Sequence, residues 1–201
     1  MLNSILVIEA VKTIYPNIKG GFSYWQTKPD GTPWESDIDG LVWENTDYTK
    51  PDLEQLNSVI ALLLIKDAKD KKIAEIKAIR DAKNIEPISN YKGFIIDADG
   101  TVTTQESYFV FHTNRHPTNP ASDPDAIISR TMELGSLPYF TKDANGDEIA
   151  IQLNAELAVS LRQKIVERNN NNYALSSSIE IEINNAQTTE EVDAITLAAW
   201  S

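Results

Sequence analysis

The chain has 201 residues, enough for one ordinary domain or two small ones, and its lack of cysteine excludes disulfides, thiolate metal sites and a cysteine nucleophile. Hydrophobic residues make up 41% and charged residues 24%, a balance that supports a folded core. Eighteen basic against thirty acidic residues give a formal net charge of -12, which argues against nucleic acid and against an anionic membrane surface as partners.

Residues 1–52 are predicted to form a compact, Trp-rich docking module. Its apolar opening ends at Pro16 and lacks the basic region and cleavage site of a signal peptide. Alternating residues over 22–27 and 38–43 predict two strands, and Pro29-Asp30-Gly31 between them has the chemistry of a turn. We therefore expect a β-hairpin that carries three tryptophans, Trp25, Trp34 and Trp43.

At least one of these tryptophans is expected to contact a partner. Roughly fifty residues cannot bury three indole rings completely. Trp34 follows Pro33 in the connecting loop, so we expect Trp34 to be the exposed one. We predict partner binding at this hairpin, through Trp25, Trp34 and Trp43.

A long helix is predicted from Leu53 to about Asn84, within a spacer segment 53–85. Neither Gly nor Pro interrupts it, and Asp52 can cap its first amides. Its longest apolar run is far too short to span a membrane. The second half carries an apolar stripe too thin for a buried helix and too apolar for a solvated one. We therefore expect this helix to pair with another helix through Ile65, Ile76 and Ile79. The partner can be the same helix of a second copy of the chain.

Residues 86–201 are predicted to form an α+β domain, a small antiparallel sheet packed on a C-terminal helical segment. Asn145-Gly146 between two alternating runs predicts a hairpin. A helix is expected to follow Asn154; we prefer one that continues through 169–172, although these four asparagines can instead form a loop between two helices. A last short helix is expected to start at Thr188, with Val192, Ile195 and Trp200 on its apolar face.

One short string, residues 95–102, resembles the first motif of haloacid-dehalogenase-type phosphatases. In that family the first Asp of the motif is a nucleophile and the second a general acid, which here correspond to Asp97 and Asp99. The chemistry also needs a later lysine and an acidic pair for Mg²⁺. Lys142 is available, but no acidic pair fits, and the chain has too few βα units for a doubly wound sheet. We interpret the string as a hairpin turn and expect neither enzymatic activity nor a cofactor.

Two further patterns suggest metal binding, and both are incomplete. The same string lacks a liganding position and the bidentate Glu of a calcium loop. His112 and His116 are four residues apart, but they lie in a Pro-rich loop without a third ligand. No metal site is expected.

Residues 15–56 resemble a short module in small bacteriophage tail proteins encoded near fibre genes. In that module a Pro, an aromatic strand and an apolar-x-Trp strand lead into a Pro-initiated helix. The matching residues are Tyr15-Pro16, Phe22, Asp30-Gly31, Ile38, Leu41-Val42-Trp43 and Lys50-Pro51-Asp52-Leu53-Glu54-Gln55-Leu56.

Residues 79–198 resemble a domain of unknown function that recurs at the C-terminus of phage tail and tail-fibre-associated proteins. One departure is Phe140, where the related domains carry a Trp. The matching residues are Arg80, Gly93-Phe94, Thr104-Gln105-Glu106, Phe140 to Gly146, Leu153, Glu156-Leu157, Ala186 and Thr188 to Ile195.

Together the two resemblances imply a structural adaptor of a bacteriophage tail-fibre or baseplate assembly. Such a protein would be located in the virion tail after assembly in the host cytoplasm, and it would bind other tail proteins. Trimers are common among fibres and their attachments in the resembling families. The alternative is a tail-fibre assembly chaperone that is absent from the mature virion. No catalytic residues are implied by either resemblance.

Overall fold

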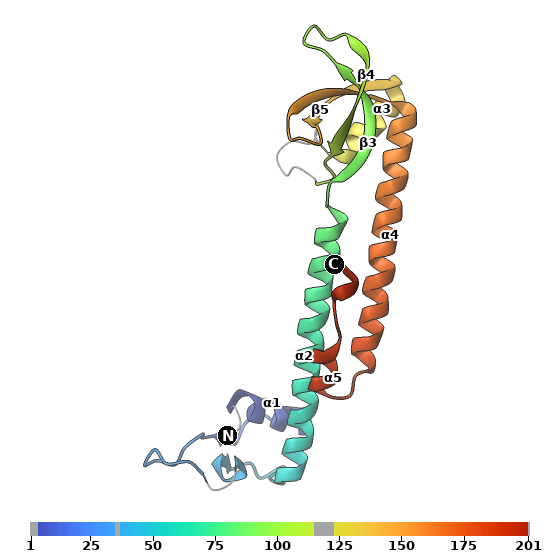
Figure 1. The fold of residues 1–201 in the computed structure, drawn as a ribbon. Helices are drawn as coiled ribbons and strands as arrows, with labels where there is room; N and C mark the ends of the chain where they lie inside the picture. Colours follow the sequence, from blue (N-terminus) through green and yellow to red (C-terminus); the bar gives the residue numbers. More distant parts are fainter. Residues whose placement is uncertain (1–3, 35–36, 115–122, 201) are drawn as a thin grey trace. The chain divides into compact units, whose positions relative to one another are not determined.

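The structure is a computed structural model that describes residues 4–34, 37–114 and 123–200. Its fold class is α+β, as predicted from the sequence. The chain divides into two compact units, and the helices and strands of both are drawn in Figure 1. Unit 1 comprises Met1–Ile73 and Glu182–Thr196, and unit 2 comprises Ala74–Ile181 and Leu197–Ser201. The boundaries between the two units fall inside two long helices. The functional segments predicted from the sequence end instead at residues 52 and 85, and that functional division stays a prediction.

Unit 1 contains a short helix, a small sheet and the first part of a long helix. Its elements are α1 (Ser4–Ile14), β1 (Phe22–Tyr24), the 3₁₀ helix η1 (Asp37–Gly40), β2 (Leu41–Trp43), the start of α2 (Leu53–Asn84) and α5 (Thr189–Ala194). Strands β1 and β2 are antiparallel, with Phe22 opposite Trp43. The predicted strand over 38–43 is therefore wrong in its first half, because Asp37 to Gly40 form a 3₁₀ turn; Asp and Gly are poor strand formers.

The core of unit 1 lies between α1, the small sheet and the first turns of α2. Side chains on one face of each helix meet the buried face of the sheet. Fully buried members are Val7, Ala10, Val11, Leu41, Leu56 and Ile60. The helix α2 begins as predicted: Asp52 Oδ1 accepts a hydrogen bond from the Gln55 amide at 2.8 Å, and Gln55 Oε1 accepts one from the Asp52 amide at 3.0 Å.

Unit 2 contains a four-stranded antiparallel sheet in the order β4-β3-β6-β5. Its strands are β3 (Ile88–Ile96), β4 (Val102–Phe111), β5 (Ser136–Lys142) and β6 (Glu148–Asn154), and α3 (Pro124–Leu134) connects β4 to β5. The predicted hairpin at Asn145-Gly146 is confirmed as the β5–β6 connection. A bridge between Phe109 and Asp143 brings β4 to the end of β5, so the sheet curls.

One face of this sheet packs on helices. The helix α4 (Ala155–Asn185) runs without interruption through residues 169–172, as the sequence favoured, and Asn154 Oδ1 caps it by accepting from the Leu157 amide at 2.8 Å. The buried cluster joins the sheet to α3 and α4 and consists of Ile88, Phe109, Phe111, Ile127, Ile128, Tyr139, Ile151, Leu153, Ala158 and Leu161.

The last predicted helix is confirmed in its position but is shorter than expected. Thr188 caps α5, and Val192 is buried, as the pattern indicated. The helix ends at Ala194, and Trp200 belongs to a separate 3₁₀ turn, η3 (Ala198–Trp200), which is part of unit 2. Within the described residues, no helix is long and apolar enough to cross a membrane.

Candidate functional site

Trp43 belongs to an aromatic cluster that supports the small sheet of unit 1. Its ring centroid lies 5.9 Å from that of Tyr15 and 5.9 Å from that of Phe22, and Tyr15 lies 4.9 Å from Tyr48. The Trp43 indole donates a hydrogen bond to the Tyr48 carbonyl at 3.0 Å, so its polar atom is satisfied inside the unit. Half-buried Trp43 is therefore chiefly a support for the sheet.

Trp34 is also tied to its own unit. Its indole Nε1 donates a hydrogen bond to the Trp25 carbonyl at 2.9 Å, and its side chain is half-buried. Gly40 allows this approach, because a Cβ there would lie 2.3 Å from the Trp25 carbonyl oxygen and 3.2 Å from Trp34 Cδ1. The expectation that Trp34 is the exposed indole is thus wrong, and the reason is a tertiary contact that its place in a proline-rich loop did not reveal.

Trp25 is the indole that the fold presents to solvent. Its side chain is 61% exposed, while its backbone is held on both sides. The Trp25 amide donates to the Gly40 carbonyl at 2.9 Å, and the Trp25 carbonyl accepts from Trp34. A large aromatic side chain on a fixed backbone loses little conformational entropy when a partner covers it.

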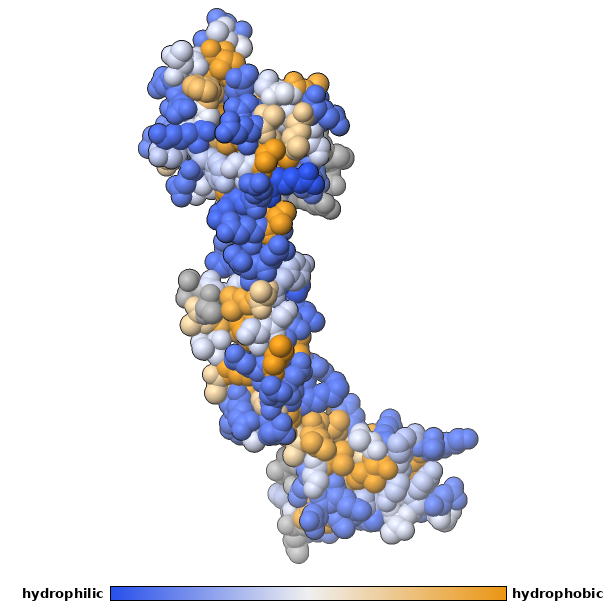
Figure 2. All heavy atoms as spheres, turned by 90° about the vertical axis from the view of Figure 1, so that its right-hand side faces the viewer, coloured by the Kyte–Doolittle hydropathy of each residue, from blue (hydrophilic) through white to orange (hydrophobic). Residues whose placement is uncertain are grey.

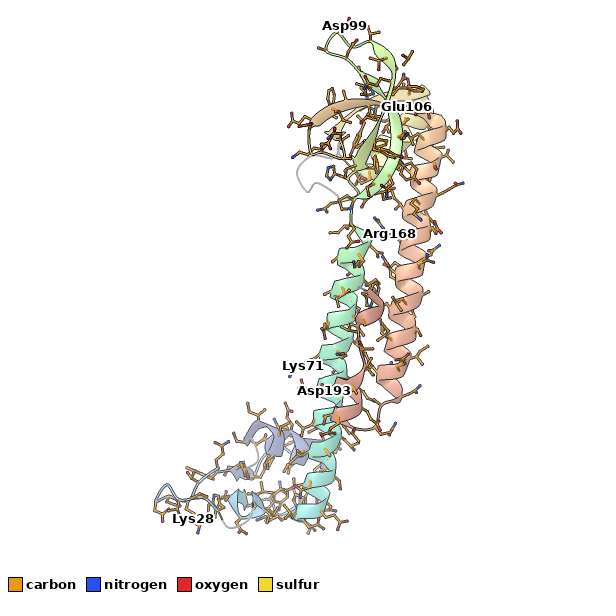
Figure 3. All side chains as sticks on the ribbon, in the orientation of Figure 1. Lys28, Lys71, Asp99, Glu106, Arg168 and Asp193 are labelled. Carbon is orange, nitrogen blue, oxygen red and sulfur yellow. The ribbon has the colours of Figure 1, made fainter. Side chains whose placement is uncertain are left out.

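The chain after Trp25 forms an ordered extension, which we call the Trp25 loop (residues 25–34, with Lys28 labelled in Figure 3). The Lys28 amide donates to the Thr32 carbonyl at 2.8 Å, and the Gly31 amide donates to the Lys28 carbonyl at 2.9 Å. Asp30 Oδ1 accepts hydrogen bonds from both the hydroxyl and the amide of Thr32. Both bonds lower the pKa of Asp30, and the bond from the hydroxyl has the larger effect. Pro29 within this turn and Pro33 directly after it stiffen the loop further.

The predicted helix-pairing stripe is distributed over both units. Ile65, in unit 1, and Ile79, in unit 2, are half-buried, whereas Ile76 is fully buried. Within unit 2, α2 lies beside α4 (Figure 1), so Ile76 is covered by its own chain and not free for an outside partner in this structure. Contacts that join the two helices within unit 2 include Lys77 to Glu180 at 3.9 Å, Arg80 over the Tyr173 ring at 4.6 Å, and Asn172 to Asn84 at 2.9 Å.

Arg168 of α4 secures the end of α2 (Figure 3). Its guanidinium donates hydrogen bonds to the carbonyls of Asn84 and Glu86 and, at 3.3 Å, to the Thr113 hydroxyl. The carbonyls at a helix C-terminus lack partners within the helix, and a cation there also meets the negative end of the helix dipole. This contact is structural, and it could not be predicted from the sequence because the partners are more than fifty positions apart.

The phosphatase-like string is the β3–β4 hairpin turn. The Asp97 amide donates to the Thr101 carbonyl at 3.0 Å, and the Gly100 amide donates to the Asp97 carbonyl at 3.0 Å. Both Asp97 and Asp99 accept a hydrogen bond from the Thr101 amide at 2.9 Å. The interpretation of the string as a hairpin turn is therefore confirmed, while the absence of enzymatic activity stays a prediction.

The candidate metal ligands are only partly within the described residues. His112 is exposed immediately after β4, whereas His116 lies outside the described part of the chain. Among residues 4–34, 37–114 and 123–200, no group of three His, Cys, Asp or Glu side chains is arranged to hold a metal ion.

An exposed apolar face on the unit 2 sheet was not predicted from the sequence. Phe140 is 79% exposed, and Val102 and Phe94 are 40% and 39% exposed. The available signal was the alternation of Phe140 with Tyr139 and Thr141 along one strand. Alternation reveals two faces of a strand, but it does not reveal whether one or both are covered.

Apolar side chains also reach the surface on unit 1, and Figure 2 shows hydrophobic patches on one face of the molecule. Ile5 on α1 is 63% exposed, and Leu62 and Leu64 on α2 are 65% and 42% exposed. Ile5 and Leu64 line a shared groove between these helices. Contiguous exposed apolar surface is typical of proteins that bind other proteins.

No family model, curated protein or solved structure matches this chain.

Proposed function

We propose that this protein is a non-enzymatic structural adaptor of a bacteriophage tail-fibre or baseplate assembly and that it binds another tail protein through the Trp25 loop. The likeness of residues 15–56 and 79–198 to phage tail modules supports the assignment to the tail. An acidic surface with a net charge of -12 fits protein partners better than nucleic acid.

The exposed indole of Trp25 on a fixed backbone carries the proposal. Tryptophan is enriched at the energetic centres of protein interfaces, where truncation to alanine typically costs about 2 kcal/mol or more. The hydrogen bonds of Trp25 to Gly40 and Trp34 hold the loop in place before binding. The Trp25 loop is therefore a preorganised protein-binding element.

The proposal predicts that the chain is present in mature particles. Quantitative mass spectrometry of purified virions should find it in a fixed ratio to the fibre or baseplate proteins. Its absence from the particle, together with defective fibres in a deletion mutant, would contradict the adaptor function and favour the assembly chaperone.

Self-association through the 53–84 helix is a separate part of the proposal. Exposed Leu62 and Leu64 supply free apolar surface on α2, whereas Ile76 is already covered. Light scattering at high protein concentration is expected to show an oligomer that Leu62→Ser weakens. Leu134→Ser is the matched control, because Leu134 is equally exposed, at 64%, at the end of α3 in unit 2. A strict monomer with intact helices would contradict self-association.

A further inference from the structure

Four apolar side chains form a continuous row across the sheet of unit 2. Phe140 of β5 is opposite Ala150 of β6, Ala150 is opposite Ile96 of β3, and Ile96 is opposite Val102 of β4. Directly opposed residues in neighbouring strands point to the same face of a sheet. The row therefore crosses every strand of the sheet on one face.

This face is opposite to the one that forms the core. The neighbours of Phe140 along β5, Tyr139 and Thr141, are buried, and Ile151 beside Ala150 is fully buried in the cluster with α3 and α4. The row itself bounds a cavity of about 900 Å³, here called the sheet groove, whose lining includes Ile96, Val102, Pro138, Phe140, Ala150 and Gln152. Exposure of 79% for a phenylalanine ring is unfavourable unless something covers it.

The charges around the sheet groove are predominantly negative. Asp97 and Glu148 line it, and Glu106 lies opposite Phe94 on the same face (Asp99 and Glu106 are labelled in Figure 3). Lys142 and His112 also line it; Lys142 is directly opposite Glu148 in the strand pairing, so these two charges offset each other and the negative balance comes from Asp97 and the carboxylates around the groove. Other carboxylates lie in the two adjoining turns, namely Asp99, Asp143 and Asp147.

We propose that the sheet groove binds a segment of a partner protein that carries bulky apolar side chains flanked by lysine or arginine. The apolar row would receive the apolar side chains, and the surrounding carboxylates would attract the basic ones. A second copy of this chain is disfavoured as the occupant, because two faces with the same acidic rim repel each other. The sheet groove is a different surface from the Trp25 loop, and the proposal does not depend on the assignment of the protein to a phage tail.

Peptide binding to the full chain tests the proposal directly. The probe is a short fluorescein-labelled peptide in which lysine alternates with leucine and phenylalanine, followed by fluorescence anisotropy. Two comparison peptides replace all lysines by glutamate or all apolar residues by serine. We expect saturable binding of the first peptide only, and binding should weaken as salt is added. Equal binding of the glutamate peptide would overturn the proposal.

Variants locate the binding to the sheet groove. Phe140→Ser should weaken the affinity about tenfold or more, the loss expected for a central aromatic contact. The matched control is Ile181→Ser, which removes an exposed apolar side chain (61%) from α4 and should leave binding unchanged. Replacing both Glu106 and Glu148 by Gln should lower the affinity and flatten its salt dependence.

Chemical-shift mapping on the full chain completes the test. Addition of the lysine peptide should shift the amides of Ile96, Val102, Phe140 and Ala150. Unchanged affinity in Phe140→Ser, or shifts confined to other surfaces, would contradict the proposal. Concentration-dependent dimerisation that Phe140→Ser abolishes would also contradict it, because the face would then be an interface between copies.

Discussion

Three glycines show how single residues shape the loops that carry the exposed surfaces. Gly31, Gly100 and Gly146 have φ values of 83°, 86° and 92°, a region that favours glycine. Each glycine occupies the same place in its turn, since its amide donates a hydrogen bond to the carbonyl three residues earlier. The amide of that earlier residue in turn donates to the carbonyl of the residue after the glycine. This is the pattern of a three-residue hairpin loop that ends in a left-handed residue.

Gly146→Ala tests this pattern. The substitution introduces no clash, since nothing lies within 4 Å of a Cβ at this position, so its cost is conformational. We expect the free energy of unfolding of unit 2 to fall by about 1 kcal/mol. Urea unfolding should show a smaller loss for Gly146→Asn, because asparagine tolerates the left-handed region better. Equal stability of wild type and the alanine variant would contradict the conformational argument.

Asp143, in the β5–β6 turn, makes the stability of unit 2 depend on pH. Hydrogen bonds from the amides of Asp147 and Asn145 lower the pKa of Asp143 in the folded state, with Asp147 the largest contribution. The unfolded chain then binds more protons at low pH, so this stabilisation is present above the ordinary carboxyl pKa of about 3.9 and is lost as the pH falls through the lowered folded value.

The pH dependence can be isolated by substitution. Asp143→Asn keeps an acceptor for both amides but does not titrate. Thermal unfolding should show wild type more stable than Asp143→Asn at neutral pH, with the difference shrinking below about pH 4. A difference that is the same at pH 3 and pH 7 would show that the carboxylate charge contributes nothing.

At the scale of elements, local signals predicted the long helices well. The starts of α2 and α4 were predicted from the capping residues Asp52 and Asn154, and their lengths from the lack of Gly and Pro. Short elements were less predictable: Ile38 fits an alternating pattern, yet Asp37 to Gly40 form a 3₁₀ turn. Burial was the least predictable feature. The sequence placed Trp25 in a strand and Trp34 in a loop and so favoured Trp34 as the exposed indole, whereas the hydrogen bond from Trp34 to the Trp25 carbonyl, which the close approach at Gly40 permits, holds Trp34 half-buried and leaves Trp25 exposed.

The α2–α4 pairing in unit 2 depends on a planar guanidinium. Arg168 reaches two backbone carbonyls at once, a geometry that the single ammonium of lysine does not reproduce. Arg168→Lys should therefore lower the free energy of unfolding by about 1.5 kcal/mol, the usual range for hydrogen bonds to a charged group. Arg162→Lys on the exposed face of α4 is the control and should be neutral in urea unfolding. Equal effects of the two substitutions would refute this assignment.

At the scale of the whole molecule, the chain presents separate surfaces on its two units. The Trp25 loop belongs to unit 1 and the sheet groove to unit 2, so each can bind a different protein. The sequence predicted a docking function for the Trp-rich hairpin of unit 1 but did not predict the sheet groove. The reason is that the packing of α3 and α4 decides which face of the sheet is covered. The two proposed binding surfaces would together meet what an adaptor requires.

The proposed adaptor function depends most on Trp25, and Trp25→Ala, introduced into the gene of the phage that the proposal implies, tests it most directly. Because the indole is 61% exposed, the substitution should leave the melting temperature of the purified protein nearly unchanged. Trp34→Ala is the comparison: it removes the hydrogen bond to the Trp25 carbonyl and should lower the melting temperature. Mass spectrometry of purified virions should find the Trp25→Ala chain strongly depleted from the particles. Wild-type amounts of a stably folded Trp25→Ala chain in the virion would contradict the account.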